Sequence, residues 1–223
     1  MVDYLLLSAF VGACEQKPEL VIPFLREGDG EAVKVFPGEE GLFFEDLSRK
    51  LTVNGALNVT EDLELREKVT MTFNTKKVCT VGRDVMLRSG AKVTHTSNTG
   101  SADSYAVDMV VGRNFTVEDT AAVAADGLGR TATSAIHGGS SGYNNAVDGE
   151  QGACYDSVFQ PILSGGDGDK KGGGIIHLTV GGTLSVYGSA PANGYSDSRK
   201  VASDGWGSGA GGSVWITCAR LVG

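Results

Sequence analysis

A nine-residue pattern of apolar and polar positions recurs along the chain. The first, third, seventh and ninth positions are apolar, and the break between the third and seventh always contains Gly or Asn. Because residues two apart point to the same face of a strand, each copy predicts two short strands joined by a turn. No stretch shows a sustained helical period. The four copies are 51–59, 79–87, 109–117 and 178–186.

The spacing of these copies predicts a solenoid. The copies begin 28, 30 and 69 residues apart. The first two intervals suit one winding with its loops, whereas the third requires an insertion or additional windings. We expect the third position of every copy to fall in one inward column, formed by Val53, Val81, Val111 and Val180.

A second likeness links the two halves of the chain. Small residues precede Asp126-Gly127, and small residues also precede Asn193-Gly194. Such pairs favour left-handed backbone at a corner. We therefore expect the two segments to be structurally related.

The composition divides the chain. Residues 1–126 contain 10 Gly and residues 127–223 contain 23, while five of the eight Phe lie in the first 46 residues. We expect 1–46 to form a small N-terminal cap or interface segment. The rest, 47–223, is expected to be the repeat domain, with a glycine-rich insertion at about 127–174.

The glycine-rich half carries a family resemblance. Its motifs include His137-Gly138-Gly139-Ser140-Ser141-Gly142-Tyr143, a run at 172–180 (GGGIIHLTV) and another at 209–217 (GAGGSVWIT). In order and spacing these resemble the glycine-rich repeat segment of large extracellular or cell-surface, adhesin-like proteins. The resemblance spans about 105–223 and implies an all-β, right-handed parallel β-helix.

Charge and cysteine spacing exclude several classes of function. With 19 basic and 27 acidic residues the net charge is −8, which argues against binding nucleic acid or an anionic membrane. No apolar run has the roughly 20 residues of a membrane-spanning helix.

The segment before Cys14 can be interpreted in more than one way. Its small residues resemble a lipidation signal, but no basic residue precedes Lys17, so a buried cap element or a subunit interface is the other interpretation. The cysteines (Cys14, Cys79, Cys154 and Cys218) have no zinc-site spacing, and one disulfide remains open.

The candidate site residues lie mainly in glycine-rich sequence. Exposed aromatic rings can stack on sugars, and a nearby acid can bind hydroxyl groups, which gives a candidate glycan site; its members are Tyr143, Tyr155, Asp156, Tyr195 and Trp206. Asp167 and Asp169 partly match a calcium-binding repeat, so Ca²⁺ is the only cofactor left open, although the motif occurs once. We assign no catalytic residue, since acids in such loops ordinarily solvate turns.

The sequence favours a non-enzymatic surface or assembly module. Its expected partners are other protein subunits or further repeats of the same chain, and surface glycans are the expected class of ligand. The expected location is extracellular or at the cell surface. A virion or phage tail-associated β-helix is one alternative, and a polysaccharide lyase or glycoside hydrolase is another. Residues 220–223 do not resemble a polar solenoid cap, so we expect either a fragment or an end that stacks on another chain.

Overall fold

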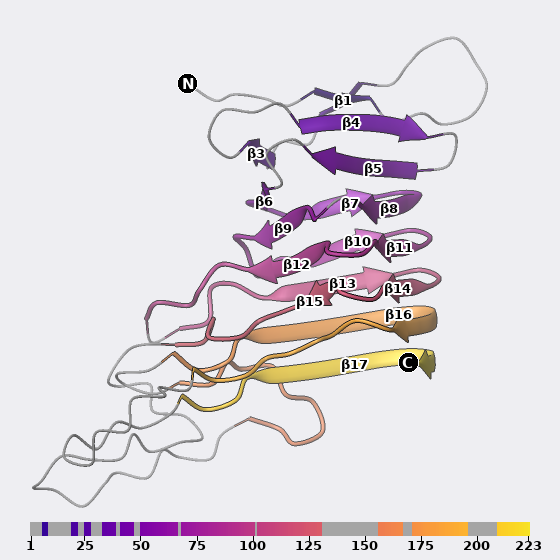
Figure 1. Cartoon of the computed structure of the whole chain (residues 1–223). Helices are drawn as coiled ribbons and strands as arrows, with labels where there is room; N and C mark the ends of the chain where they lie inside the picture. The colour runs from indigo at the N-terminus through magenta and orange to yellow at the C-terminus, as the bar shows by residue number, and fades with distance from the viewer. Residues whose placement is uncertain are drawn as a thin grey trace, which may run out of the picture.

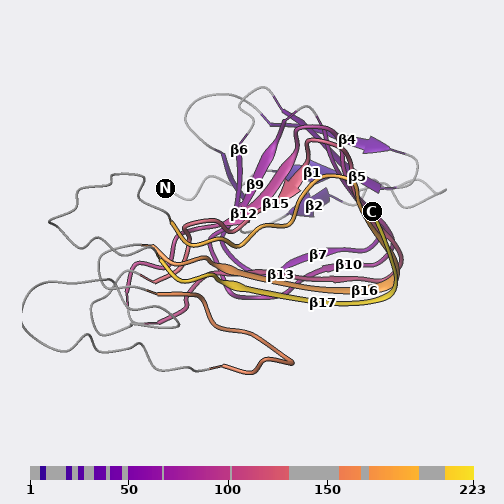
Figure 2. The same cartoon turned by 60° about the horizontal axis from the view of Figure 1, so that its bottom comes forward.

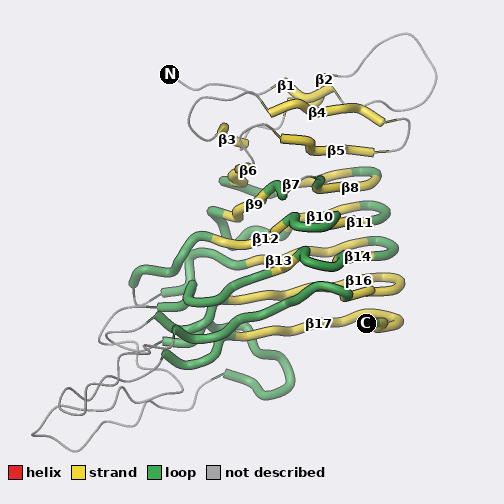
Figure 3. The backbone as a smooth tube through the Cα atoms, viewed as in Figure 1, coloured by secondary structure: helices red, strands yellow, loops and turns green. Residues whose placement is uncertain are grey.

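The structure is a computed structural model, and its described residues are all β or loop, without a helix (Figures 1 and 3). It describes residues 6–8, 19–21, 25–27, 33–38, 41–46, 50–66, 68–100, 102–130, 156–166, 171–195 and 209–223, with side chains from residue 50 onward. The strands are β1 (Leu6–Ser8), β2 (Glu19–Val21), β3 (Leu25–Glu27), β4 (Val33–Gly38), β5 (Gly41–Asp46), β6 (Lys50–Val53), β7 (Leu57–Val59), β8 (Asp62–Leu65), β9 (Thr70–Phe73), β10 (Cys79–Val81), β11 (Val85–Leu87), β12 (Lys92–His95), β13 (Val107–Val111), β14 (Phe115–Val117), β15 (Ala122–Val123), β16 (Ile175–Val186) and β17 (Ser213–Val222).

From β6 onward the strands pair in three parallel series. One series runs β7, β10, β13, β16, β17, and a second runs β8, β11, β14, β16. The third runs β6, β9, β12, β15. Each strand therefore lies beside its counterpart from the next segment of chain, and the segments lie in layers (Figure 1). Viewed along the stack, the first and third series occupy separate sides (Figure 2).

The apolar column is confirmed at three of its four expected positions, and the fourth is wrong. Val81, Val111 and Val180 are in register and no more than 2 % exposed, but the residue aligned above them is Val59. Val53 instead pairs with Phe73 in the third series. The cause is an ambiguity of six residues, because 57–65 carries the same apolar pattern as 51–59 and is the copy that pairs with 79–87.

In the described residues of the long interval between the last two copies, no strand lies between β13 and β16 in the first series. β13 and β16 are direct neighbours, with Met109 aligned to Leu178. β16 continues around the next corner and also pairs with β14, aligning Phe115 with Leu184. Of the two explanations for this interval, an insertion is therefore the one that fits the pairing.

Glycines at the first corner allow the layers to approach closely. A Cβ on Gly82 would lie 2.1 Å from the carbonyl oxygen of Thr60, and one on Gly112 would lie 2.1 Å from that of Gly82. Gly181 repeats the contact against Gly112, at 2.4 Å. The glycine in the repeat is thus required by the stacking distance, since none of these three residues has a positive φ.

A ladder of side chains crosses the same corner. The Asp84 backbone N–H donates to Oδ1 of Asp62 at 2.8 Å, and the Asn114 N–H donates to Oδ1 of Asp84 at 2.8 Å. The Thr183 N–H continues the series by donating to Oδ1 of Asn114 at 3.0 Å. Each layer therefore satisfies a backbone donor of the next, which fixes the register at the turn.

The second corner places three aligned residues in the left-handed region. Lys68, Gly90 and Thr120 have φ values of 67°, 81° and 63°. Each precedes a residue whose N–H closes a tight turn, as in the 3.0 Å bond from Ala121 to the Glu118 carbonyl. Glycine tolerates this conformation, whereas a β-branched threonine does so at a cost of about 1–2 kcal/mol.

This corner gives a paired prediction. We expect Thr120→Gly to raise the free energy of unfolding by about 1 kcal/mol, because it relieves the strained φ. Gly90→Ala is the matched reversal, and we expect it to lower stability, since its Cβ would also lie 2.7 Å from Cγ of Lys68. Urea denaturation measures both; a loss of stability in Thr120→Gly would contradict the strain argument.

The predicted relation between the two small-residue segments is confirmed by direct hydrogen bonds. The Gly127 N–H donates to the carbonyl of Asn193 at 2.9 Å, and the Asn193 N–H donates to Oδ1 of Asp126 at 2.6 Å. Gly127 has a φ of 62°, as expected of a left-handed corner, but neither Asn193 nor Gly194 has a positive φ, so the expected left-handed corner is wrong in the second segment. The segment after β16 therefore lies against the segment after β15.

The N-terminal strands pair differently from the rest. β4 and β5 form an antiparallel pair, and β5 joins the ten-stranded sheet beside β8. β3 pairs antiparallel with β6, while β1 and β2 form a separate two-stranded sheet. The change from parallel to antiparallel pairing begins at the end of the stack where the sequence predicts a cap.

Candidate functional site

Two of the seven predicted site residues belong to the described part of the chain. These are Asp156 and Tyr195. Tyr143, Tyr155 and Trp206 of the predicted glycan site lie outside the described residues, as do Asp167 and Asp169 of the predicted calcium site. The site can therefore be built upward from Asp156.

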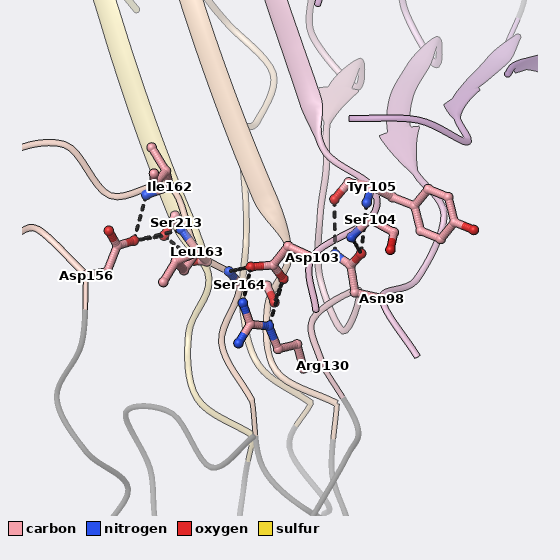
Figure 4. Close-up of polar contacts among 10 residues, drawn as sticks. All are labelled: Asn98, Asp103, Ser104, Tyr105, Arg130, Asp156, Ile162, Leu163, Ser164 and Ser213. Carbon is pink, nitrogen blue, oxygen red and sulfur yellow. Dashed lines mark hydrogen bonds and ion pairs between the residues drawn. The ribbon is translucent and has the colours of Figure 1, made fainter. Parts of the chain in front are cut away.

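Asp156 organises the loop 156–163 through its carboxylate (Figure 4). The backbone of Asp156 has a φ of 81°. Its carboxylate accepts hydrogen bonds from the backbone N–H groups of Ser157 at 2.8 Å, Ile162 at 2.6 Å and Leu163 at 2.7 Å. Oγ of Ser157 accepts from two further N–H groups at 3.1 and 3.2 Å. The carboxylate is thus engaged in holding its own loop, and its role in ligand binding stays a prediction.

The loop borders a hollow of about 330 Å³ next to the start of β17. Its wall includes Pro161, Leu163, Gly211 and Gly212. Ser213, the first residue of β17, donates from Oγ to the carbonyl oxygen of Leu163 at 2.5 Å. This bond attaches the loop to the strand (Figure 4). The rest of the wall includes the polar side chains of Asp156, Ser157, Ser164 and Ser213, so the hollow has a mixed apolar and polar lining.

Three apolar side chains of the loop point into solvent. Val158 is 90 % exposed, Phe159 is 87 % exposed and Ile162 is 47 % exposed. The loop that carries them is closed by the hydrogen bonds of Asp156 and Ser157, so they are presented on an ordered scaffold. Exposed apolar groups clustered in this way mark interaction sites.

A buried ion pair lies beside this loop. Asp103 is 1 % exposed and accepts from Nε of Arg130 at 3.0 Å and from Nη2 at 2.5 Å. Ser164 donates to the same carboxylate through Oγ, and through its backbone N–H at 3.3 Å. Burial alone raises the pKa of Asp103, but the hydrogen bonds from Arg130 and Ser164 and the charge of Arg130 outweigh it and lower the pKa.

This pair joins two described ranges that are distant in the sequence. Arg130 ends the range 102–130 and Ser164 lies in the range 156–166, and both bind the carboxylate of Asp103. The loop carrying Asp103 is held in turn by Asn98, whose Oδ1 accepts from the N–H groups of Ser104 and Tyr105 at 2.8 and 2.9 Å. Since the carboxylate is buried and fully engaged, the arrangement suits a clasp better than a catalytic acid.

His95 is a buried polar residue among the apolar side chains. It is 2 % exposed; Nδ1–H donates to the Thr96 carbonyl at 2.8 Å, and Nε2 accepts from the Ile175 N–H at 3.0 Å. These partners require the neutral ring. Burial lowers its pKa, although the Thr96 bond and the charge of Asp103 act in the opposite direction.

We expect His95 to make the fold sensitive to mild acid. Because its pKa is lowered on folding, the unfolded chain binds more protons below pH 6.5, so stability is present above that pH and is lost as the pH falls. The loss is at most about 1.4 kcal/mol per pH unit. Urea denaturation at several pH values between 7.5 and 5.5 gives the free energy of unfolding as a function of pH. This free energy should fall less steeply with falling pH in His95→Gln than in the wild type, and an equal fall in both would contradict the assignment.

His177 and Trp215 form an aromatic pair that the sequence reasoning missed. The ring of His177 stacks on Trp215 with centroids 4.2 Å apart, and its Nδ1 lies 3.1 Å from Oδ1 of Asp108. The signal was the parallel alignment of GGGIIHLTV (172–180) with AGGSVWITC (210–218), which puts His177 beside Trp215 in register.

Tyr195 is exposed, as predicted, but the structure does not unite it with Asp156. Its side chain is 56 % exposed, and its backbone N–H donates to the Lys171 carbonyl at 2.8 Å. Among the hydrogen bonds of the described residues, none joins Tyr195 to the loop of Asp156. Tyr187, which is 59 % exposed, is the other tyrosine of this segment.

Other classes of site are limited to what the described residues show. Nowhere in the described ranges do three His, Cys, Asp or Glu side chains gather as metal ligands would. None of the described segments forms a helix of the length and apolarity that a membrane span requires. Cys79 and Cys218 are free thiols, and burial raises the pKa of Cys79 to about 12. Cys79 thus fills a core position, as its place in the repeat predicts.

Comparison of the chain with models of protein families, with curated proteins and with solved structures gave no match.

Proposed function

We propose that this chain is a right-handed parallel β-helix with an N-terminal cap, serving as a non-enzymatic surface or assembly module. The observation that carries the proposal is the unbroken register of β7, β10, β13 and β16, which aligns Val59, Val81, Val111 and Val180. A scaffold of this type builds a long, rigid face from backbone hydrogen bonds between layers. The antiparallel pair of β4 and β5, which lies beside β8, supports the placement of a cap at this end of the stack.

Two features support a scaffold role over an enzymatic one. The buried carboxylate of Asp103 is neutralised by Arg130, and the carboxylate of Asp156 is engaged by three N–H groups of its own loop. A glycosidase requires a pair of carboxyl groups facing the substrate. Exposed Tyr187 and Tyr195 favour glycans as the ligand class of a surface module, since such rings stack on sugars.

Engineered disulfides test the winding. Thr80 and Val110 are aligned on β10 and β13, and Met86 and Thr116 are aligned on β11 and β14. Neighbouring strands lie about 4.8 Å apart, within the span of a disulfide. We expect Thr80→Cys/Val110→Cys and Met86→Cys/Thr116→Cys to oxidise readily, whereas the recombined pair Thr80→Cys/Thr116→Cys should not. Linkage in the recombined pair alone would overturn the fold.

The functional assignment is tested by binding and by turnover. We expect a glycan array to detect binding to surface polysaccharides and a reducing-end assay on acidic polysaccharides to detect no release of product. Product release above a heat-denatured control would replace the scaffold proposal with the polysaccharide-cleaving alternative. If no glycan binds, the proposal that glycans are the ligand is wrong. The assembly role is tested separately, by measuring the oligomeric state of the protein.

A further inference from the structure

Apolar residues that are buried in β16 have exposed apolar counterparts in β17. Ile176 and Leu184 of β16 are fully buried, but their aligned partners Val214 and Leu221 are 39 % and 64 % exposed. Within the described residues, β17 pairs with β16 alone, so its other edge presents backbone groups that can accept a further strand. This edge of ten residues is long for an uncovered strand.

The ordered loop 156–163 adds apolar surface at the same place. Ser213 joins the loop to the start of β17, and Val158 and Phe159 stand almost fully in solvent. The hollow of about 330 Å³ lies directly beside them. One face, which we call the β17 face and define as β17 with residues 156–163, thus carries an apolar projection beside a recess of mixed apolar and polar lining.

Charge distinguishes the β17 face from the rest of the chain. Residues 156–163 contain Asp156 as their only charged side chain, and β17 contains only Arg220. The whole chain carries 27 acidic and 19 basic residues. Outside this face the chain carries 27 − 1 = 26 acidic and 19 − 1 = 18 basic residues, so contact between two copies there is opposed by the net negative charge, whereas two copies meeting at this face would bring together one acid and one base from each.

We propose that the β17 face binds a second copy of this chain about a two-fold axis. Across such an axis the two β17 edges run antiparallel, so they can continue the sheet from one copy to the other. The same axis carries Val158 and Phe159 of each copy toward the recess of its partner, because projection and recess are neighbours on one surface. The inference rests on the proposed assembly role and names the partner.

Oligomeric state and a charge insertion test the interface. Sedimentation velocity of the full chain across a concentration series should show a monomer–dimer equilibrium. Phe159→Asp should weaken dimerisation at least tenfold, because it places a charge in the apolar contact. Val78→Asp adds the same charge at a side chain that is 39 % exposed and outside the β17 face, so it should leave the equilibrium unchanged. Circular dichroism and a thermal melt establish that each variant is folded.

Alkylation of Cys218 supplies a local measurement. Cys218 is aligned with inward Val180 and is partly exposed, so dimerisation should slow its reaction with iodoacetamide as the protein concentration rises. We expect this slowing in the wild type and not in Phe159→Asp. A wild-type monomer at every concentration would overturn the proposal, and so would a dimer that Phe159→Asp does not weaken and in which Cys218 reacts as fast as in the monomer. The engineered disulfides form within one chain, so their failure separately identifies an error in the winding.

Discussion

Gly212→Ala will destabilise the protein by about 3 kcal/mol, the size of effect seen when a packed site receives an extra group. The new Cβ would lie 2.0 Å from the carbonyl oxygen of Gly174 and 2.5 Å from the carbonyl carbon of Gly173. These are backbone atoms of the segment entering β16. They cannot retreat without disturbing the 3.0 Å bond from the Ser213 N–H to the Gly174 carbonyl. Urea denaturation followed by circular dichroism measures the loss.

The neighbouring glycine provides the control for this prediction. A Cβ on Gly211 would meet no atom within 4 Å, and this residue has no positive φ. Gly211→Ala should therefore leave the free energy of unfolding within about 0.5 kcal/mol of the wild type or raise it slightly. Equal losses in the two variants would mean that the close approach at Gly212 is wrong.

Arg130→Met will cost about 3–5 kcal/mol at neutral pH, because it leaves the Asp103 charge buried without its cation. Combined with Asp103→Asn, the cost should be smaller than the sum of the two single losses, which identifies the pair as coupled. The pKa of Asp103 is lowered on folding, so the contribution of the pair is present above about pH 4 and is lost as the pH falls further.

Arg113→Met is the control for the buried pair. Arg113 is 55 % exposed and lies 3.8 Å from Asp84, so its removal should cost no more than about 1 kcal/mol. Denaturation curves at pH 7 and pH 4 compare the variants. If Arg130→Met cost as little as Arg113→Met, the clasp between Asp103 and Arg130 would not join the ranges 102–130 and 156–166 as the geometry indicates.

The sequence predicted the parallel layers because their signal is local. Alternating apolar residues such as Cys79 and Val81 indicate, within three positions, which face of the strand is buried. The register of the first layer was wrong because Val53 and Val59 satisfy the same pattern, and only the pairing of β7 with β10 and of β6 with β9 distinguishes them. Periodicity identifies which side of a strand is buried but leaves repeats of equal pattern interchangeable.

The site was predicted less well, because it depends on contacts between distant segments. Asp103 is 27 residues from Arg130 and 61 from Ser164, and no spacing rule links them. Asp156 was chosen as a carboxylate near aromatic residues, whereas its hydrogen bonds give it a local role in the loop. The exposed Val158 and Phe159 were not singled out, since two apolar residues in a glycine-rich stretch give no sign of facing solvent.

The three corners of the stack differ in how freely the chain length can change. The first is closed by glycine contacts and the second by tight turns, but chain segments of very different length leave and rejoin at the third (Figure 3). There, β12 connects to β13 by a short path, whereas β15 connects to β16 through residues 124–174. Peptides inserted into the loops at this corner in successive layers would lie side by side, separated by the distance between neighbouring strands. The chain could therefore be used to display epitopes at regular spacing.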